Sequence, residues 1–269
     1  MFDIYWIITF LALGSIVGLM AGLLGIGGGG IMVPILTTIF LINGVPTETV
    51  VHLALGTSMA SIIVTSISSL RAHHLKGAVI WNIVKKMSPG IIVGAFLATF
   101  IVRQASSFYL AIFFSLFMSF IAVQMFINKT PKPNRKISKT SDLLVAGSGI
   151  GAISAMVSIG GGSLTVPYLV WHNIDIKKAI GTSAAIGLPI SIAGTVGYLI
   201  NGWSIHTHST EAFTFGFIYL PAVVCISCAS YLTAPYGVKL AHKLHISVLK
   251  KVFSLLLILL SLKMLFSVI

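Results

Sequence analysis

Two glycine-rich stretches decide the fold of this chain: IGGGGIMVP at residues 26–34 and IGGGSLTVP at residues 159–167. A second pair of matching stretches follows in the same order, LGTSMA at residues 55–60 and IGTSAA at residues 180–185. Similar elements that recur in the same order indicate an internal repeat. The sequence therefore predicts two related halves, each built around a run of glycines.

The composition around these elements is that of a membrane protein. Of 269 residues, 57% are hydrophobic and 8% are charged, whereas charged residues make up about a quarter of an ordinary soluble domain. A membrane-spanning helix needs about 20 apolar residues, and runs near that length lie at residues 4–24, 50–70, 84–102, 108–127, 179–200, 213–232 and 249–269. The first run lacks a positively charged start, so we expect a retained membrane segment instead of a signal peptide.

The distribution of positive charge predicts the topology. If each half has five segments, with each glycine run at the tip of a hairpin, all of the 17 lysines and arginines except Arg103 and Lys263 fall on one face. By the positive-inside rule this face is cytoplasmic, and both termini and the loops near Glu48 and Glu211 lie on the opposite side. Four spans per half would put the basic linker and the loop near Lys239 on opposite faces, so five segments are favoured.

An odd number of segments inverts the second half relative to the first. We therefore predict an all-α polytopic membrane protein with two inverted repeats of about five segments each, residues 1–127 and 142–269, joined by a basic linker at residues 128–141. The segments that follow the glycine runs, residues 31–42 and 164–171, are too short to span a bilayer at about 1.5 Å per residue. We expect them to be half-helices that begin at glycine-rich hairpin tips.

The glycine runs and the Gly-Thr-Ser stretches are predicted to bind an anion. Irregular backbone at membrane depth is tolerated where it lines a protected cavity, and the N-terminus of a half-helix would turn free N–H groups and a positive dipole end toward that cavity. Glycine lets these amides approach a small oxyanion, and hydroxyls add donors. The predicted substrate-binding residues are Gly27, Gly28, Gly29, Gly30, Thr57, Ser58, Gly160, Gly161, Gly162, Ser163, Thr182 and Ser183.

The same residues also have a structural interpretation. Glycine allows membrane helices to pack closely, and serine and threonine hydroxyls often bond back to their own helix. For His52 an ordinary structural hydrogen bond is favoured over a titrating role, and for Cys225 and Cys228 packing between helices is favoured over contact with a sulfur substrate. The other histidines we considered are interpreted as loop residues: His73, His74, His206, His208, His242 and His245.

Several kinds of chemistry have little support in the sequence. The five acidic residues all fall near segment ends, which argues against an intramembrane carboxylate as proton carrier. A serine nucleophile needs a base in reach, and neither a Gly-x-Ser-Gly stretch nor a second buried histidine is evident in the sequence, so we do not expect an enzyme. Two cysteines inside one predicted helix cannot build a disulfide framework or a four-ligand zinc site. We expect no metal and no cofactor.

Together with RAHHLKGAV at residues 71–79, these motifs resemble the sulfite exporter TauE/SafE family of membrane permeases, and the resemblance covers essentially the whole chain. The second half departs from the pattern, since Ser163 replaces a fourth glycine and no Arg-His cluster follows its Gly-Thr-Ser stretch. The resemblance implies a secondary transporter that moves a small sulfur-containing anion, such as sulfite, thiosulfate or an organosulfonate, across the bacterial inner membrane by alternating access.

The expected partners follow from this resemblance and from the charge. The net charge of +12 lies in short loops beside membrane segments, so the partners are the lipid bilayer and the anion, and not nucleic acid. A passive channel, or a carrier for another small organic or inorganic anion, stays open as the alternative. The sequence also leaves open a coupling ion, the direction of transport and assembly as a homodimer.

Overall fold

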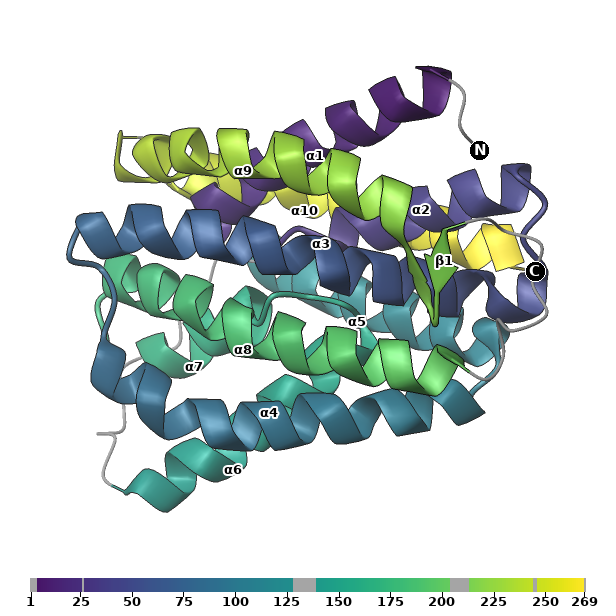
Figure 1. Ribbon diagram of the computed structural model, residues 1–269. Helices are drawn as coiled ribbons and strands as arrows, with labels where there is room; N and C mark the ends of the chain where they lie inside the picture. The colour runs from purple at the N-terminus through teal and green to yellow at the C-terminus, as the bar shows by residue number, and fades with distance from the viewer. Residues whose placement is uncertain (1–3, 26, 128–138, 204–212, 244–245, 269) are drawn as a thin grey trace.

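The protein is almost entirely helical. The computed structural model describes residues 4–25, 27–127, 139–203, 213–243 and 246–268, which form ten helices and one small β-hairpin (Figure 1). The helices are α1 (Ile4–Leu24), α2 (Gly29–Ile42), α3 (Thr47–Leu75), α4 (Trp81–Gln104), α5 (Ser107–Ile127), α6 (Thr140–Met156), α7 (Gly162–Trp171), α8 (Ile176–Trp203), α9 (Leu220–Lys243) and α10 (Ile246–Val268). In the described part, α1, α3, α4, α5, α8 and most of α9 are long and apolar enough to cross a membrane. The predicted all-α polytopic class is confirmed.

Two helix pairs turn back inside the molecule. In Figure 1, α1 enters from one end of the bundle and α2 returns to that end, while α6 and α7 do the same from the opposite end. The turn that leads into each returning helix needs a left-handed backbone: Gly28 before α2 has φ 81° and Gly161 before α7 has φ 80°. This conformation is unfavourable for residues with a Cβ atom, so the glycines permit each helix to begin there.

The helices pair reciprocally between the two halves of the chain. The first helix of each half packs along the fourth helix of the other, so that α1 lies on α9 and α6 lies on α4. The central helices α3 and α8 pack on each other, and α5 packs on α10. Helices within a half also pack on each other, as α2 does on α3 and α7 on α8, but the most extensive contacts run between the halves, so the core is shared, as expected for two inverted copies.

Glycines bring the paired helices into backbone contact. On α1, a Cβ atom added at Gly14, Gly18 or Gly22 would overlap the backbone of α9. On α4, a Cβ atom at Gly94 would overlap the carbonyl oxygen of Ser148 on α6. Small residues spaced by four are how membrane helices pack closely, so many of the glycines outside the two runs have a packing role.

One predicted segment is wrong at its start. Residues 213–219 were expected to begin a membrane helix, but they form the antiparallel strands β1 (Thr214–Phe215) and β2 (Ile218–Tyr219), and α9 begins at Leu220. The backbone has φ 69° at Phe213 and φ 55° at Gly216, which are turn conformations and not helical ones. Hydropathy alone did not distinguish this apolar turn from a helix.

The interpretation of the histidine cluster as a loop is also wrong. Helix α3 continues to Leu75 and includes both His73 and His74. His73 is buried, with its Nε2 atom 3.2 Å from the carbonyl oxygen of Gly22, and the Nδ1 atom of His74 accepts a hydrogen bond from Trp81. Of the remaining predicted loop histidines, His242 lies within α9, whereas His206, His208 and His245 lie outside the described residues.

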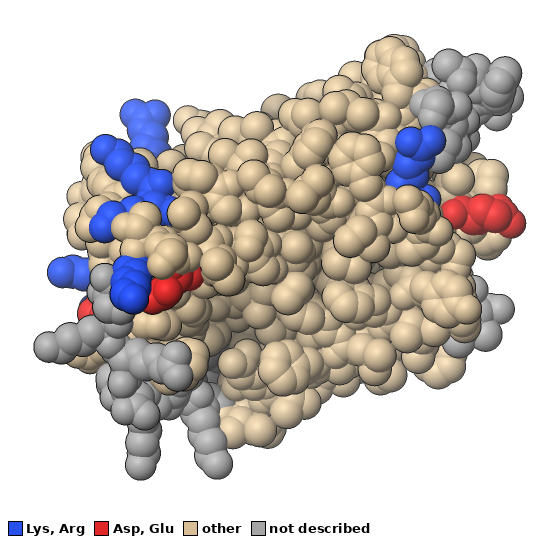
Figure 2. Space-filling view, turned by 90° about the horizontal axis from the view of Figure 1, so that it is seen from below, with Lys and Arg blue, Asp and Glu red and all other residues tan. Residues whose placement is uncertain are grey.

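The charged side chains gather at the ends of the bundle. Figure 2 shows a larger group of basic side chains at one end of this face and a smaller one at the other, with acidic side chains near each group and an uncharged surface between them. This distribution agrees with loops that alternate between two faces. The predicted boundaries of the two repeats and the side on which the basic end lies stay predictions.

Close helix packing at the α4–α6 contact gives a testable prediction. The variant Gly94→Ala should lower the free energy of unfolding by roughly 1–3 kcal/mol, because its Cβ atom would meet the backbone at Ser148. The matched control is Gly149→Ala on α6, where a Cβ atom meets no described heavy atom within 4 Å. Thermal unfolding in detergent measures both. Equal melting temperatures for the two variants would contradict backbone contact at this interface.

Candidate functional site

The two glycine loops touch each other inside the bundle. A Cβ atom at Gly27 would lie 2.6 Å from the Cα atom of Gly160, and one at Gly29 would overlap the carbonyl oxygen of Ser158. Because the loops come from hairpins that enter at opposite ends (Figure 1), their contact lies in the interior of the molecule. Glycine is needed here because the two backbones leave no space for a side chain.

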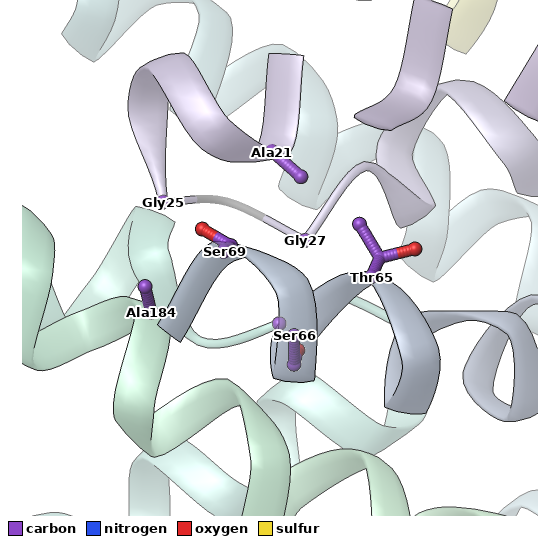
Figure 3. Close-up of a pocket in the computed structure, with 8 residues that line it drawn as sticks. Ala21, Gly25, Gly27, Thr65, Ser66, Ser69 and Ala184 are labelled. Carbon is purple, nitrogen blue, oxygen red and sulfur yellow. The ribbon is translucent and has the colours of Figure 1, made fainter. Parts of the chain in front are cut away.

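A small cavity lies beside this contact (Figure 3). Its lining residues are Ala21, Gly25, Gly27, Thr65, Ser66, Ser69, Gly160 and Ala184. The cavity volume is about 10 Å³, close to the smallest space that holds one water molecule. A sulfur oxyanion has at least four heavy atoms, so the cavity must widen before it can hold one.

The surrounding helices approach this cavity closely. A Cβ atom at Gly187 on α8 would lie 2.9 Å from the carbonyl oxygen of Gly160 and 3.0 Å from the Oγ atom of Ser66 on α3. The absence of a side chain at Gly187 therefore lets α3, α8 and the second glycine loop meet at one place. The cavity is enclosed by elements from both halves of the chain.

The electrostatic character of the cavity comes from backbone and hydroxyl groups. Helix α2 begins at Gly29 and α7 begins at Gly162, each two residues after a glycine that lines the cavity. The first N–H groups of a helix have no intrahelical acceptor, and this end of the helix dipole is positive. None of the described lining residues is charged. Such a site suits a small anion without requiring a buried cation.

The hydroxyls of α3 differ in how they are used. The Thr65 hydroxyl lies 2.7 Å from the Ser230 hydroxyl and donates to the carbonyl oxygen of Ser61, and Figure 3 shows it pointing away from the glycine loop. The Ser69 hydroxyl points into the space between α3 and Gly25. Ser69 is buried, and its oxygen has no hydrogen-bond partner among the residues that the structure describes.

The threonines of the two Gly-Thr-Ser stretches form hydrogen bonds to non-helical segments from the other half of the chain. The hydroxyl of Thr57 accepts a hydrogen bond from the backbone N–H of Tyr219 at 3.0 Å. In the other half, the hydroxyl of Thr182 accepts one from the backbone N–H of Ile80, also at 3.0 Å. Tyr219 and Ile80 each stand immediately before the fourth helix of the opposite repeat. Each threonine therefore secures the entry to a helix that belongs to the other half.

The glycine before each threonine makes room for this same segment. A Cβ atom at Gly56 would overlap the carbonyl oxygen of Phe217, and one at Gly181 would lie 2.5 Å from that of Ala78. The two Gly-Thr pairs thus make the same contacts in both halves. This gives the duplicated motif a structural role that hydropathy patterns do not reveal.

The structure separates the predicted site residues into groups. Gly27 and Gly160 line the cavity. The other predicted residues of the glycine runs lie in the adjoining turns and first helical turns: Gly28, Gly29, Gly30, Gly161, Gly162 and Ser163. Thr57 is eight residues before Thr65, about 12 Å along α3, and Thr182 makes the corresponding contact on α8.

The two serines of the Gly-Thr-Ser motif are buried but differ in bonding. Ser183 donates to the carbonyl oxygen of Ile180 at 2.8 Å and lies beside Gly25. Ser58, like Ser163 at the start of α7, has a buried hydroxyl without a partner in the described part of the chain. Whether these residues contact substrate stays a prediction.

The sequence analysis did not identify several lining residues. Gly25, Thr65, Ser66 and Ser69 line the cavity but were not predicted. The signal was present, since Thr65, Ser66, Ser68 and Ser69 place four hydroxyls in five positions of an otherwise apolar run. A cluster of polar side chains inside a membrane segment is unusual enough to indicate a cavity.

His52 and the two cysteines lie outside this cavity. The Nε2 atom of His52 is 3.0 Å from the carbonyl oxygen of Val102 and 3.1 Å from that of Ala105, and the imidazole stacks on Phe217. These contacts agree with the prediction that His52 makes ordinary structural hydrogen bonds. On α9, Cys225 is half-buried and Cys228 is exposed.

The long apolar helices are those of a polytopic membrane protein, and comparison with known proteins identifies it as a membrane transporter. Residues 10–264 match the family model described as Sulfite exporter TauE/SafE, and the chain belongs to this family. It is 34% identical over 260 residues to a probable membrane transporter protein of Haemophilus influenzae, covering 96% of this chain and 98% of the relative. It is 28% identical over 239 residues to a probable membrane transporter protein of Methanocaldococcus jannaschii, covering 86% and 85% of the two chains. No solved structure matches.

The contact at Thr57 gives a second prediction. Replacing Thr57 by valine removes the acceptor for the Tyr219 N–H, so the variant should lose roughly 1–3 kcal/mol of stability through an unpaired buried donor. The control Thr57→Ser keeps the hydroxyl and should retain most of the stability. Thermal unfolding in detergent compares them. If the valine and serine variants have the same melting temperature, the hydrogen bond does not contribute to stability.

Proposed function

We propose that this protein is a secondary transporter that carries a small sulfur-containing anion across the bacterial inner membrane by alternating access. The observation that carries this proposal is the meeting of two half-helix N-termini, from hairpins that enter at opposite ends, at one small cavity in the interior. Inverted repeats with broken helices at their interface are typical of secondary transporters. The family to which the chain belongs supports the same class of function.

The cavity supports an anion as the cargo. Two positive helix ends adjoin it, and its polar side chains are hydroxyls, which can donate to oxygen acceptors. Sulfite, thiosulfate and organosulfonates are compact anions with several such oxygens. The name of the family model points to sulfite within this group.

The small size of the cavity supports alternating access. A channel needs a continuous hydrated pathway, whereas this cavity has room for about one water molecule. The two hairpins reach the cavity from opposite ends, so movement at either end would expose the same central site to a different side. This is how a carrier binds on one side and releases on the other.

Counterflow in liposomes tests the proposed function directly. Purified protein is reconstituted into vesicles loaded with unlabelled sulfite, thiosulfate, sulfate, taurine, sulfoacetate or chloride, and entry of labelled thiosulfate or sulfite is followed. We expect a sulfur anion inside the vesicle to drive transient accumulation of label, and the rate to saturate. Non-saturating flux without counterflow would instead identify a channel, and no flux of any sulfur anion would refute the assigned substrate class.

A binding measurement supplies independent evidence. A ligand that binds the native state raises its apparent stability, by about 2.7 kcal/mol at 100 times the dissociation constant. We expect at least one of the same sulfur anions to raise the melting temperature of the protein in detergent, and chloride to have a smaller effect. Equal responses to every anion would indicate a salt effect and not a site.

The proposed orientation can be tested by labelling from each side. In a variant in which Cys225 and Cys228 are replaced by serine, a single cysteine is introduced at Glu48 or at Lys76, both exposed and at opposite ends of α3. Since the basic end is proposed to be cytoplasmic, a membrane-impermeant maleimide should label Glu48→Cys in intact bacterial cells, and Lys76→Cys after permeabilisation. The reverse pattern would invert the topology.

A further inference from the structure

We propose that the anion binds to one side of the contact between the two glycine loops, against α3, and that the hydroxyls of Ser69 and Ser66 donate hydrogen bonds to it. This inference rests on the proposed anion transport and names residues that determine the affinity of the site. It assigns the hydroxyl donors of the site to the first repeat, although residues of both repeats line the cavity.

The state of the Ser69 hydroxyl is the first observation. Hydroxyls in membrane helices usually donate to a carbonyl oxygen three or four residues earlier, as Ser61 and Ser88 do in this chain. Ser69 is 3% exposed, and its oxygen has no partner among the described residues. It points into the cavity instead (Figure 3). A buried unpaired hydroxyl is costly, and a ligand that accepts its hydrogen bond removes that cost.

The second observation is the difference between the two repeats. Counted from the Gly-Thr-Ser motif, Ser69 on α3 corresponds to Gly194 on α8, and Ala184 on α8 corresponds to Met59 on α3. Ser69 and Ala184 line the cavity. At the corresponding place in the other repeat, the Met59 side chain covers Gly194, where an added Cβ atom would lie 2.9 Å from the Met59 Cγ atom.

A second pair of residues extends this asymmetry. Thr65 lines the cavity, and the residue that corresponds to it on α8 is Ile190. Ile190 is fully buried and packs against the second glycine loop, since a Cβ atom at Gly161 would lie 2.6 Å from its Cδ1 atom. In the other half of the molecule, the place that corresponds to the cavity is thus filled by the side chains of Met59 and Ile190. The chain therefore has one anion site and not two.

This arrangement explains how a site without a described cation can select an oxyanion. The half-helix ends supply positive potential at the glycine loops. On the α3 side the unpaired Ser69 hydroxyl would supply a directed donor, and the hydroxyl of Ser66, which also lines the cavity, would supply a second one. Sulfite, thiosulfate and organosulfonates carry several oxygen acceptors, so one oxygen can face the loops while another faces α3. Widening the cavity by separating α3 from Gly25 would admit the anion between these two sets of donors.

The test replaces each of the two proposed donor serines by alanine, one at a time. Ser69→Ala removes a buried hydroxyl that makes no hydrogen bond with the described protein, so its melting temperature without ligand should equal or exceed that of the wild type. The dissociation constants for sulfite and thiosulfate should rise about tenfold or more, as expected for loss of a hydrogen bond to a charged group. Ser66→Ala should weaken binding in the same direction.

The matched control is Ser191→Ala, which corresponds to Ser66 in the other repeat. Ser191 donates to the carbonyl oxygen of Leu188 at 3.0 Å and is not among the lining residues. Its variant should bind sulfite and thiosulfate as the wild type does. Titration of the wild type should give one bound anion per chain.

The outcomes distinguish failure of this inference from failure of the proposed function. If the wild type binds a sulfur anion but Ser69→Ala binds it equally well, or Ser191→Ala loses as much affinity, or two anions bind per chain, the one-sided site is wrong while transport stands. If neither sulfite, thiosulfate nor taurine binds to the wild type, both are overturned. Selective loss of affinity in Ser69→Ala with one anion per wild-type chain supports the inference.

Discussion

The contact between two backbone loops, at Gly27 and Gly160, is the constraint on which the rest of this structure depends. Each loop ends a helix that has entered from its own end of the bundle and starts one that returns to that end. Polar backbone groups exposed in this way inside a membrane protein must be satisfied by protein or by a wet cavity. The loops therefore have to meet deep in the bundle, and the long helices α3 and α8 have to enclose them.

Exchange of helices between the halves follows from that requirement. The first helix of each hairpin has an apolar face that the fourth helix of its own repeat does not cover. The fourth helix of the other repeat packs on that face instead, so that α9 lies on α1 and α4 lies on α6. The Gly-Thr pairs strengthen this exchange, because Thr57 and Thr182 each bond to the chain that enters the opposite repeat's fourth helix. The proposed binding site and the Gly-Thr contacts between the halves thus lie on neighbouring parts of α3 and α8. Movement of one repeat against the other must preserve the Gly-Thr contacts or exchange them.

The partial charges around the proposed anion site would favour passage of the anion over its retention. Helix ends carry roughly half an elementary charge, and hydroxyls carry none, so an anion between them is attracted less strongly than it would be by a buried lysine or arginine. A transporter has to release its cargo on each cycle, and a site made of partial charges makes release easier. Close packing at Gly187 and at the loop contact keeps the cavity narrow, which in the proposed alternating-access cycle would limit a continuous leak of ions.

The sequence by itself determined the helical membrane class, the duplicated glycine runs and the short helices that follow them, because hydropathy, segment length and glycine conformation are local properties. It also located Gly27 and Gly160, since their pattern could be recognised without neighbours. It placed residues 213–219 in a helix and did not identify Ser66 and Ser69, because an apolar turn has the hydropathy of a helix and a serine has the same letter whether its hydroxyl bonds to its own helix or faces a cavity. Only the tertiary structure decided that Thr57 bonds to Tyr219, that Met59 covers Gly194, and that the Ser69 hydroxyl is left facing the cavity. Those contacts join residues far apart in the chain, and packing between the two halves selects among the several arrangements that one local pattern allows.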